Sequence, residues 1–210
     1  MVEAGGSDRK LILDLPAALS FVYQSKELGW GLQSGPEPYL GGKTLDEKQG
    51  RVIGGSTSIN AMICNRGNPM DYDGWAALGL PESDYAHCLP YFRKMETFAD
   101  AANAWRGGDG PMQISRCKAE HKLNEVFLRA GEQAGYAVTP DHNGYQQEGL
   151  HVAQAIIHHG RGWSAARAYL YPARTFRRAV RCGHRRRRRA LGRGGELRQP
   201  DRVALERRPV

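Results

Sequence analysis

The apolar positions between Lys122 and Gln133 recur with the period of an α-helix. They fall at i, i+3, i+4 and i+7, the spacing of one helix face, and are Leu123, Val126, Phe127 and Ala130. Gly135 follows, and glycine is a common residue just past the end of a helix. The pattern predicts an amphipathic helix that serves packing rather than chemistry.

A second amphipathic helix is predicted between Ser83 and Glu96, where Leu89, Phe92 and Met95 share a face. It too is expected to be a packing element. Further along, the run VAQAII at Val152–Ile157 predicts a strand.

Ser164 is a suitable N-cap for a short helix that we expect to continue through Leu170. Nearer the N-terminus, residues 11–28 have apolar positions at mixed spacing, interrupted by proline, and predict a loop entering a short helix. Residues 29–44 are rich in Gly and Pro and predict an extended excursion, and residues 65–75 predict an irregular loop.

The stretch GRVIGGSTSIN, residues 50–60, is the most informative in the chain. A short apolar segment runs into Gly54 and Gly55, and apolar residues then follow at helical spacing at Ile59, Met62 and Ile63. This order predicts a turn that leads into the N-terminus of a buried helix.

Two interpretations of this turn are open. Glycines without a Cβ let a ligand approach the backbone, and Ser56, Thr57 or Ser58 can cap a first turn whose free N–H groups favour an electron-rich ligand. Alternatively, the same residues simply begin a helix.

Composition bounds the chain without identifying it. A length of 210 residues suits one core, or one domain and part of another. No stretch approaches the roughly 20 apolar residues of a membrane span, and no secretory signal pattern is present. We therefore expect a cytoplasmic protein, with association at the inner face of the membrane as an open alternative.

The cysteines and histidines do not form a metal-site pattern. Cys64, Cys88, Cys117 and Cys182 are far apart and contain no CxxC pair, which argues against structural zinc and disulfides. The seven histidines lack HExxH spacing. His158 and His159 are adjacent and are expected to point in different directions, so we predict no metal site.

The net charge of +8 is unevenly distributed. Residues 1–173 carry a net charge of −3, and residues 174–210 carry +11 with fourteen arginines and no lysine. This last segment is too poor in apolar residues to offset its ordering entropy. We interpret it as disordered or translated out of frame; the alternative is a basic arm that binds nucleic acid or anionic lipid.

The run GRVIGGSTSINAMICNRGNPMDYDGWAALG, residues 50–79, resembles the flavin-contacting signature of glucose–methanol–choline (GMC) oxidoreductases. YAHCLPYFRKMET at 85–97, GGDGPMQIS at 107–115 and AGYAVTPDHNGYQQEG at 134–149 are similar to the choline dehydrogenase branch. The resemblance implies FAD as cofactor and the oxidation of a primary alcohol, choline to betaine aldehyde, by hydride transfer to the flavin.

The resemblance also implies the cofactor contacts. They are Glu3, Arg51, Val52, Gly54, Gly55, Ser56, Asn60, Ala61, Met62 and Ile63. Glu3 corresponds to the acidic residue that binds the adenosine ribose. Some relatives attach FAD to a histidine at the position of Ile59, so we expect noncovalent FAD here.

Polar residues after the turn have competing interpretations. Asn60 is expected to face a polar flavin edge rather than merely end a helix, whereas Asn65 is more simply a turn asparagine. Arg66 is expected to form a structural ion pair with Asp71 or Asp73. We assign no ammonium-binding role to the tryptophans at 75, 105 and 163, because packing is their commoner role.

The predicted fold class is mixed α/β. Residues 1–80 are expected to form an incomplete Rossmann-like FAD-binding domain, 81–160 part of a substrate-binding domain, 161–173 a returning helix, and 174–210 the basic tail. We expect a chain truncated at its front, because we find no G-x-G-x-x-G turn to hold the FAD pyrophosphate.

The family's catalytic histidine and its second signature would lie beyond residue 173, where this sequence stops resembling the family. His142, His151, His158 and His159 do not match that base, so we name no catalytic residue. The expected partner is a small alcohol, with the electron acceptor unassigned. The alternatives are a basic nucleic-acid or membrane-binding protein that uses the tail, and one subunit of a split flavoenzyme.

Overall fold

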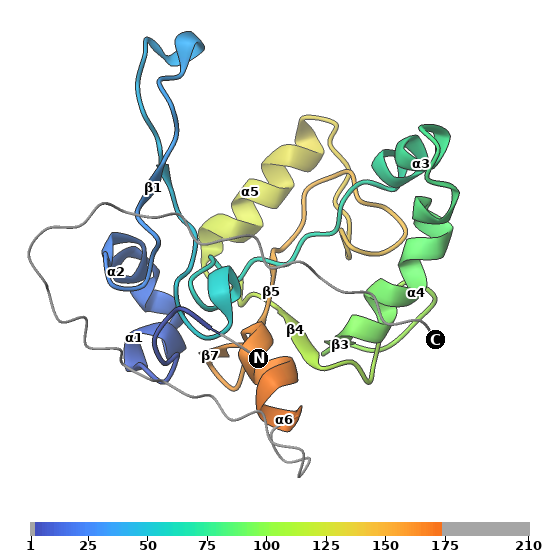
Figure 1. The fold of residues 1–210 in the computed structure, drawn as a ribbon. Coiled ribbons are helices and arrows are strands. Elements are labelled where there is room, and N and C mark those ends of the chain that lie inside the picture. The colour runs from blue at the N-terminus through green and yellow to red at the C-terminus, as the bar shows by residue number, and fades with distance from the viewer. Residues whose placement is uncertain (1–2, 174–210) are drawn as a thin grey trace, which may run out of the picture.

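The computed structural model describes residues 3–173, and the predicted tail at 174–210 lies outside them. Helices and short strands are mixed along the chain, as predicted (Figure 1). The α-helices are α1 (Leu11–Asp14), α2 (Leu19–Gln24), α3 (Pro69–Ala77), α4 (Tyr85–Met95), α5 (Lys122–Gln133) and α6 (Tyr171–Ala173). A π-helical segment, η5 (Ala166–Leu170), leads directly into α6. The 3₁₀ turns are η1 (Pro16–Ala18), η2 (Pro38–Leu40), η3 (Gly55–Ser58) and η4 (Pro81–Ser83).

The strands are short and form small sheets. They are β1 (Leu32–Gln33), β2 (Asp46–Glu47), β3 (Glu96–Phe98), β4 (Met112–Arg116), β5 (Gln154–Ala155), β6 (Ile157–His158) and β7 (Arg161–Gly162). In the central sheet β3 pairs in parallel with β4, which pairs antiparallel with β5. The predicted strand at Val152–Ile157 is therefore present in part, divided between β5 and β6.

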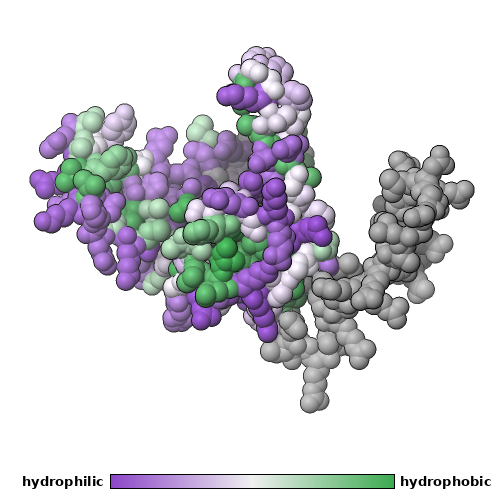
Figure 2. Space-filling view, turned by 90° about the vertical axis from the view of Figure 1, so that its left-hand side faces the viewer, coloured by the Kyte–Doolittle hydropathy of each residue, from purple (hydrophilic) through white to green (hydrophobic). Residues whose placement is uncertain are grey.

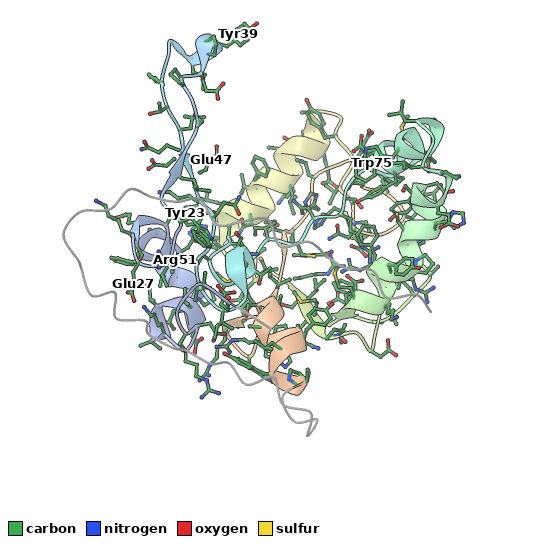
Figure 3. All side chains as sticks on the ribbon, in the orientation of Figure 1. Tyr23, Glu27, Tyr39, Glu47, Arg51 and Trp75 are labelled. Carbon is green, nitrogen blue, oxygen red and sulfur yellow. The ribbon has the colours of Figure 1, made fainter. Side chains whose placement is uncertain are left out.

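Residues 29–50 form a long antiparallel arm that contains β1 and β2, in agreement with the predicted excursion. It projects away from the rest of the molecule, with Tyr39 at its tip (Figures 1 and 3). Tyr39 is 99% exposed. At the base of the arm, the Trp30 N–H donates to the Gln49 carbonyl over 3.0 Å, and these backbone bonds hold the arm together.

The capping residues explain where the longer helices begin. Asn68 accepts a hydrogen bond from the Met70 N–H at 2.9 Å with Pro69 at the first helical position, and Asp84 accepts from His87 N–H at 2.8 Å. The predicted irregular loop at 65–75 is thus wrong beyond Asn68, because this cap starts α3.

The predicted helices at 83–96 and 122–133 are confirmed as α4 and α5. The expected packing of α5 is not observed in the described residues: Leu123, Val126 and Phe127 are each more than half exposed. The expected helix after Ser164 is also present. In its first turn, the Arg167 N–H donates a hydrogen bond to Ser164 Oγ at 3.4 Å.

Two apolar clusters form the interior. The first apolar cluster lies among α1, α2 and the glycine turn and contains Val22, Leu28, Val52 and Ile59. The second apolar cluster lies under the central sheet and η5 and contains Phe98, Met112, Ile114, Ile156 and Ala168. The side of the molecule with α1 and α2 carries a patch of hydrophobic side chains (Figure 2). Leu11 on α1, Phe21 on α2 and Leu15 between these helices are exposed.

No helix within residues 3–173 is long and apolar enough to cross a bilayer.

Candidate functional site

The glycine turn adopts the left-handed backbone that its sequence favours. Gly54 has φ +90° and Gly55 has φ +57°, conformations that are costly for residues with a Cβ. A Cβ on Gly54 would lie 2.3 Å from Ser58 Oγ and 3.2 Å from Ala166 Cβ, whereas one on Gly55 would meet nothing within 4 Å. The open approach to the backbone is therefore at Gly55, while Gly54 is packed against η5.

The hydroxyl groups of the turn form hydrogen bonds with surrounding backbone groups instead of capping a helix. Thr57 Oγ1 donates to the Gly54 carbonyl at 2.5 Å and accepts from the Ala165 N–H at 3.0 Å. Ser58 Oγ donates to the Ile53 carbonyl at 2.8 Å, and Ser56 Oγ accepts from the Gly50 N–H at 3.0 Å. The predicted capping role of these residues is wrong, because their hydroxyls bond to nearby backbone, which competes with a helix.

The predicted buried helix beyond the turn is also wrong. The 3₁₀ segment ends at Ser58, and Met62 has φ +61°, outside the helical region. Asn60 Oδ1 accepts a hydrogen bond from the Met62 N–H at 3.0 Å, which fixes this bend. The apolar spacing of Ile59 and Met62 therefore reflects burial in two different clusters rather than one helix face.

After the bend, the chain becomes an additional edge of the central sheet. The Cys64 N–H donates to the Gln154 carbonyl at 2.8 Å, and the Ile156 N–H donates to the Met62 carbonyl at 2.7 Å. Ile63 pairs with Ala155 between these two bonds. In antiparallel pairing of this kind, the N–H and C=O of the central residue point away from the partner strand. The Ile63 backbone groups therefore face outward.

Residues 60–63 carry unused hydrogen-bond donors, of which the Ile63 N–H faces away from β5. No acceptor among the described residues bonds the backbone N–H of Asn60, Ala61 or Ile63. Ala61 is exposed and the Ile63 side chain is 48% exposed. We call residues 60–63 the donor edge. It offers three backbone donors to an electron-rich ligand that lies against it.

The space around the turn decides from which side a ligand can approach. The cavity between the turn and α1, lined by Thr57, Asn60 and Met62 among others, has a volume of about 20 Å³, roughly the space that one water requires. It cannot accept a flavin ring. A flavin ring would therefore have to approach the donor edge from its outer face, where Ala61 is exposed and the backbone offers donors to a ligand with hydrogen-bond acceptors.

The N-terminal residues lie beside the same segment. Gly6 pairs in parallel with Val52, and the Ile53 N–H donates to the Gly6 carbonyl at 3.0 Å. Glu3 Oε1 accepts from the Gly5 N–H at 2.7 Å. Val52 is fully buried, so only its backbone is available to a ligand.

Arg51 lies at the base of the arm, near Tyr23 and Glu27 (Figure 3), with its guanidinium carbon 5.5 Å from the centre of the Trp30 ring. It also lines a cavity of about 430 Å³. The other residues lining this cavity are Ala4, Gly5, Gly6, Ser7, Lys10, Lys26, Glu27, Leu28 and Val52. The cavity has room for a nucleotide-sized group next to three cationic side chains.

A buried polar network fixes the chain that follows the donor edge. Arg106 is fully buried and donates to Glu96 Oε1 at 2.7 Å, Asp141 Oδ1 at 2.8 Å and Gln154 Oε1 at 2.8 Å. Arg66 Nη2 donates to Glu96 Oε1 at 2.8 Å. The expected pairing of Arg66 with Asp71 or Asp73 is wrong, because Glu96 is its partner; the expected structural role is correct.

Sequence reasoning missed this network. Its members are four charged residues and one glutamine, scattered from position 66 to position 154, and no local spacing distinguishes them from surface residues. Burial of a charge requires pairing and hydrogen bonding, so the network could be found only once the fold had brought these side chains together.

Four of the seven histidines lie in two ring pairs. The His142 and His151 rings stack with centroids 3.8 Å apart, and the His158 and His159 rings are 4.0 Å apart. The expectation that the latter two point in different directions is wrong, because they lie at the tight connection between β6 and β7. Within residues 3–173, no group of three or more His, Cys, Asp or Glu is placed to hold a metal ion.

Burial shifts two titratable groups next to the donor edge. It raises the pKa of the Cys64 thiol, with the nearby Glu96 carboxylate adding to the effect. Burial also lowers the pKa of His142, and the neighbouring His151 lowers it further. Both groups are therefore held neutral near neutral pH.

Known proteins are similar to this chain in sequence. The sequence profile of the GMC oxidoreductase family matches residues 23–184. Oxygen-dependent choline dehydrogenase of Brucella anthropi is 44% identical over 173 residues, which cover 82% of this chain and 32% of that protein. The chain thus spans about a third of the length of this curated relative.

Solved structures share the fold. Pyridoxine 4-oxidase from Mesorbium loti superposes with a TM-score of 0.78 at 27% identity, covering 84% of this chain and 35% of that one. An FAD-dependent oxidoreductase from Chaetomium thermophilum gives a TM-score of 0.72 at 28% identity, covering 82% and 32%. Since the family profile covers well over half of the sequence, the chain belongs to the GMC oxidoreductase family.

Proposed function

We propose that this chain is the flavin-contacting part of an FAD-dependent alcohol dehydrogenase whose substrate is a primary alcohol, choline above others. Membership of the GMC family and 44% identity to a choline dehydrogenase support the reaction class and the substrate. The aldehyde product in that case is betaine aldehyde.

The observation that carries the proposal is the donor edge. Three backbone N–H groups on residues 60–63 lack an acceptor within the described residues, and that of Ile63 faces away from β5. The edge of an isoalloxazine ring presents carbonyl oxygens and ring nitrogens that accept such bonds. Bound FAD would supply the hydride acceptor, and the protein would orient it.

We propose that the remaining predicted residues act around this edge. Glu3 would bind the adenosine ribose, and Arg51 and Val52 would line the nucleotide side, next to the cavity of about 430 Å³. Gly55 would allow close approach of the ligand to the backbone, and Gly54 and Ser56 would keep the turn in shape. Met62 supports the edge from beneath, where it packs against the second apolar cluster.

Noncovalent binding of FAD is part of the proposal. Ile59 is 7% exposed and belongs to the first apolar cluster. A buried aliphatic side chain offers no nucleophile for attachment to the flavin. Binding to this chain should therefore be reversible on dilution.

The same structure suggests limited activity for the chain by itself. Alcohol oxidation needs a base positioned at the substrate hydroxyl, and none of the histidines at 142, 151, 158 and 159 lies on the donor edge. We therefore propose no catalytic residue and expect no turnover. We expect weak FAD binding because this sequence contains no G-x-G-x-x-G turn to hold the FAD pyrophosphate. Stoichiometric yellow flavin together with choline-dependent dye reduction would contradict this expectation.

A titration with three ligands tests the proposal. Riboflavin, FAD and ADP-ribose are titrated into the full chain and into Ala61→Trp, whose indole would cover the donor edge. The control Ala86→Trp places the same indole on an exposed position of α4. We expect Ala61→Trp to weaken riboflavin and FAD binding at least tenfold and to leave ADP-ribose binding unchanged. Equal flavin binding by both variants would exclude the donor edge as the flavin site.

We further propose the domain division made from the sequence. The first apolar cluster draws only on residues before position 80, and the second draws mainly on residues 98–168, which supports two units. The packing of α3 on α4, on either side of residue 80, favours moving this proposed boundary toward residue 65. A cytoplasmic location and an unassigned electron acceptor stay predictions. Nucleic-acid binding depends on residues 174–210, outside the described part of the chain.

A further inference from the structure

The loop from Thr139 to Leu150, which we call the clamp loop, grips the backbone that leaves the donor edge. Asn143 Nδ2 donates to the Cys64 carbonyl at 2.9 Å, and Asn143 Oδ1 accepts from the Arg66 N–H at 2.7 Å. Gln147 Nε2 donates to the Arg66 carbonyl at 2.8 Å. Side chains of one loop thus fix three backbone groups that directly follow Ile63.

His142, also in the clamp loop, adds a contact that depends on which of its two ring nitrogens carries a proton. Its Nε2 lies 2.8 Å from Asn65 Oδ1 and 3.2 Å from the Cys64 carbonyl oxygen. Both of these oxygens are acceptors, so the hydrogen bond requires a proton on Nε2. Asn143 Nδ2 also lies 3.2 Å from Nε2, but its two hydrogens are directed to the Cys64 carbonyl and to Gln154 Oε1 and leave none for His142. The second nitrogen of the ring, Nδ1, is buried and has no hydrogen-bond partner within the described residues.

These contacts select one state of His142. The neutral ring with its proton on Nε2 satisfies both oxygens and leaves only a bare lone pair at Nδ1. The charged ring would place an N–H at Nδ1 without an acceptor, in a side chain that is 3% exposed. Burying an unsatisfied donor that carries charge is unfavourable.

The neighbouring charges act in both directions. His151 stacks on the ring at 3.8 Å, and the Arg106 guanidinium lies nearby; both oppose a positive charge on His142. Asp141 and the Cys64 carbonyl favour that charge. The sum of burial and these groups lowers the pKa of His142, with burial as the largest cause.

We propose that neutral His142 is a positioning residue for the cofactor site: it holds Cys64 and Asn65 against the clamp loop. Protonation keeps the Nε2 proton but adds an N–H without an acceptor at the buried Nδ1, so the charged ring leaves its position and releases both residues. Releasing Cys64 and Asn65 frees the end of the donor edge, because Ile63 is held in register by the Cys64 N–H on β5. The link to flavin rests on the proposed function, whereas the lock itself does not.

The first test is the tautomer of His142 in the full chain. Long-range ¹H–¹⁵N NMR spectra distinguish a proton on Nε2 from one on Nδ1, and a titration from pH 7.5 to 5 follows its charge. We expect the Nε2–H form at pH 7.5. A proton on Nδ1, or a charged ring at pH 7.5, would overturn the proposal even if every variant failed to fold.

The second test is hydrogen–deuterium exchange of the peptide containing residues 60–67, corrected for the intrinsic effect of pH. In the native chain, we expect protection at pH 7.5 to fall at least tenfold by pH 5. His142→Gln keeps a donor near the position of Nε2 and should stay protected at both pH values. His142→Phe keeps a ring without a donor and should be unprotected at both.

His158→Gln is the matched control, because His158 also has a pKa lowered by burial and lies outside the clamp loop. Its exchange profile should match that of the native chain. Native protection in His142→Phe, or a native pH profile in His142→Gln, would refute the lock. A riboflavin titration separates the two ideas: an intact lock without flavin binding would reject the proposed function and leave this inference standing.

Discussion

Replacing Arg106 with methionine should strongly destabilise this protein. Methionine keeps most of the side-chain length and removes the charge. Arg106 is fully buried, and its loss would leave Glu96, which is 1% exposed, and Asp141 without their shared cation. Breaking a buried pair by removing one partner costs about 3–5 kcal/mol.

That cost is large against the whole stability of a domain, which is about 5–15 kcal/mol. Glu96 keeps the Arg66 guanidinium at 2.8 Å and the Gly107 N–H at 3.0 Å. Because Glu96 keeps these partners, we expect Arg106→Met to lower the free energy of unfolding by about 3 kcal/mol, the lower end of the range for breaking a buried pair. Urea unfolding, followed by tryptophan fluorescence and circular dichroism, measures it.

Arg116 provides the matched control. Its guanidinium also lies over the Phe98 ring, at 5.7 Å compared with 3.8 Å for Arg106, but its pairing with Asp100 is partly exposed. Arg116→Met should therefore cost less than about 1 kcal/mol. Equal losses in the two variants would refute the claim that burial of the network, rather than contact with Phe98, determines the effect.

Three further outcomes follow from the glycine turn and the arm. Gly54→Ala should lower the free energy of unfolding by about 2 kcal/mol, because its backbone has a positive φ and its Cβ would meet Ala166 of η5. Gly41→Ala also has a positive φ, but its Cβ would point into open space, so it should lower the free energy of unfolding by only about 1 kcal/mol. Equal losses in thermal melts would contradict the packing of Gly54 against η5. Thr57→Val should cost about 1–2 kcal/mol by urea titration, because the Ala165 N–H loses its acceptor; an unchanged midpoint would contradict this. Chymotrypsin should cut first at Tyr39, which is 99% exposed, and mass spectrometry of early fragments would show any earlier cleavage elsewhere.

Local patterns predicted the elements whose signals lie within one segment. The helix face of Lys122–Gln133 defines α5 without reference to the rest of the chain, and Gly54 and Gly55 define a left-handed turn. In each case the determining interactions are between near neighbours, so the sequence contains them.

The errors occurred where distant residues decide the conformation. Helical spacing after the turn was misleading, because Met62 and Cys64 pack against residues near 112 and 156 instead of against one helix face. The partner of Arg66, thirty positions away at Glu96, was equally inaccessible to local reasoning. Asn68 and Pro69 are a local start signal for α3, so the sequence did favour a helix where we expected a loop.

The pairing of Cys64 with Gln154 has a consequence for the order of assembly. These residues lie 90 positions apart, and the entropy of closing such a chain segment is roughly 4 kcal/mol. Contacts at this separation form slowly compared with helices. During synthesis, the donor edge can acquire its final shape only after β5 has left the ribosome, so the ligand-facing surface should be among the last parts to mature.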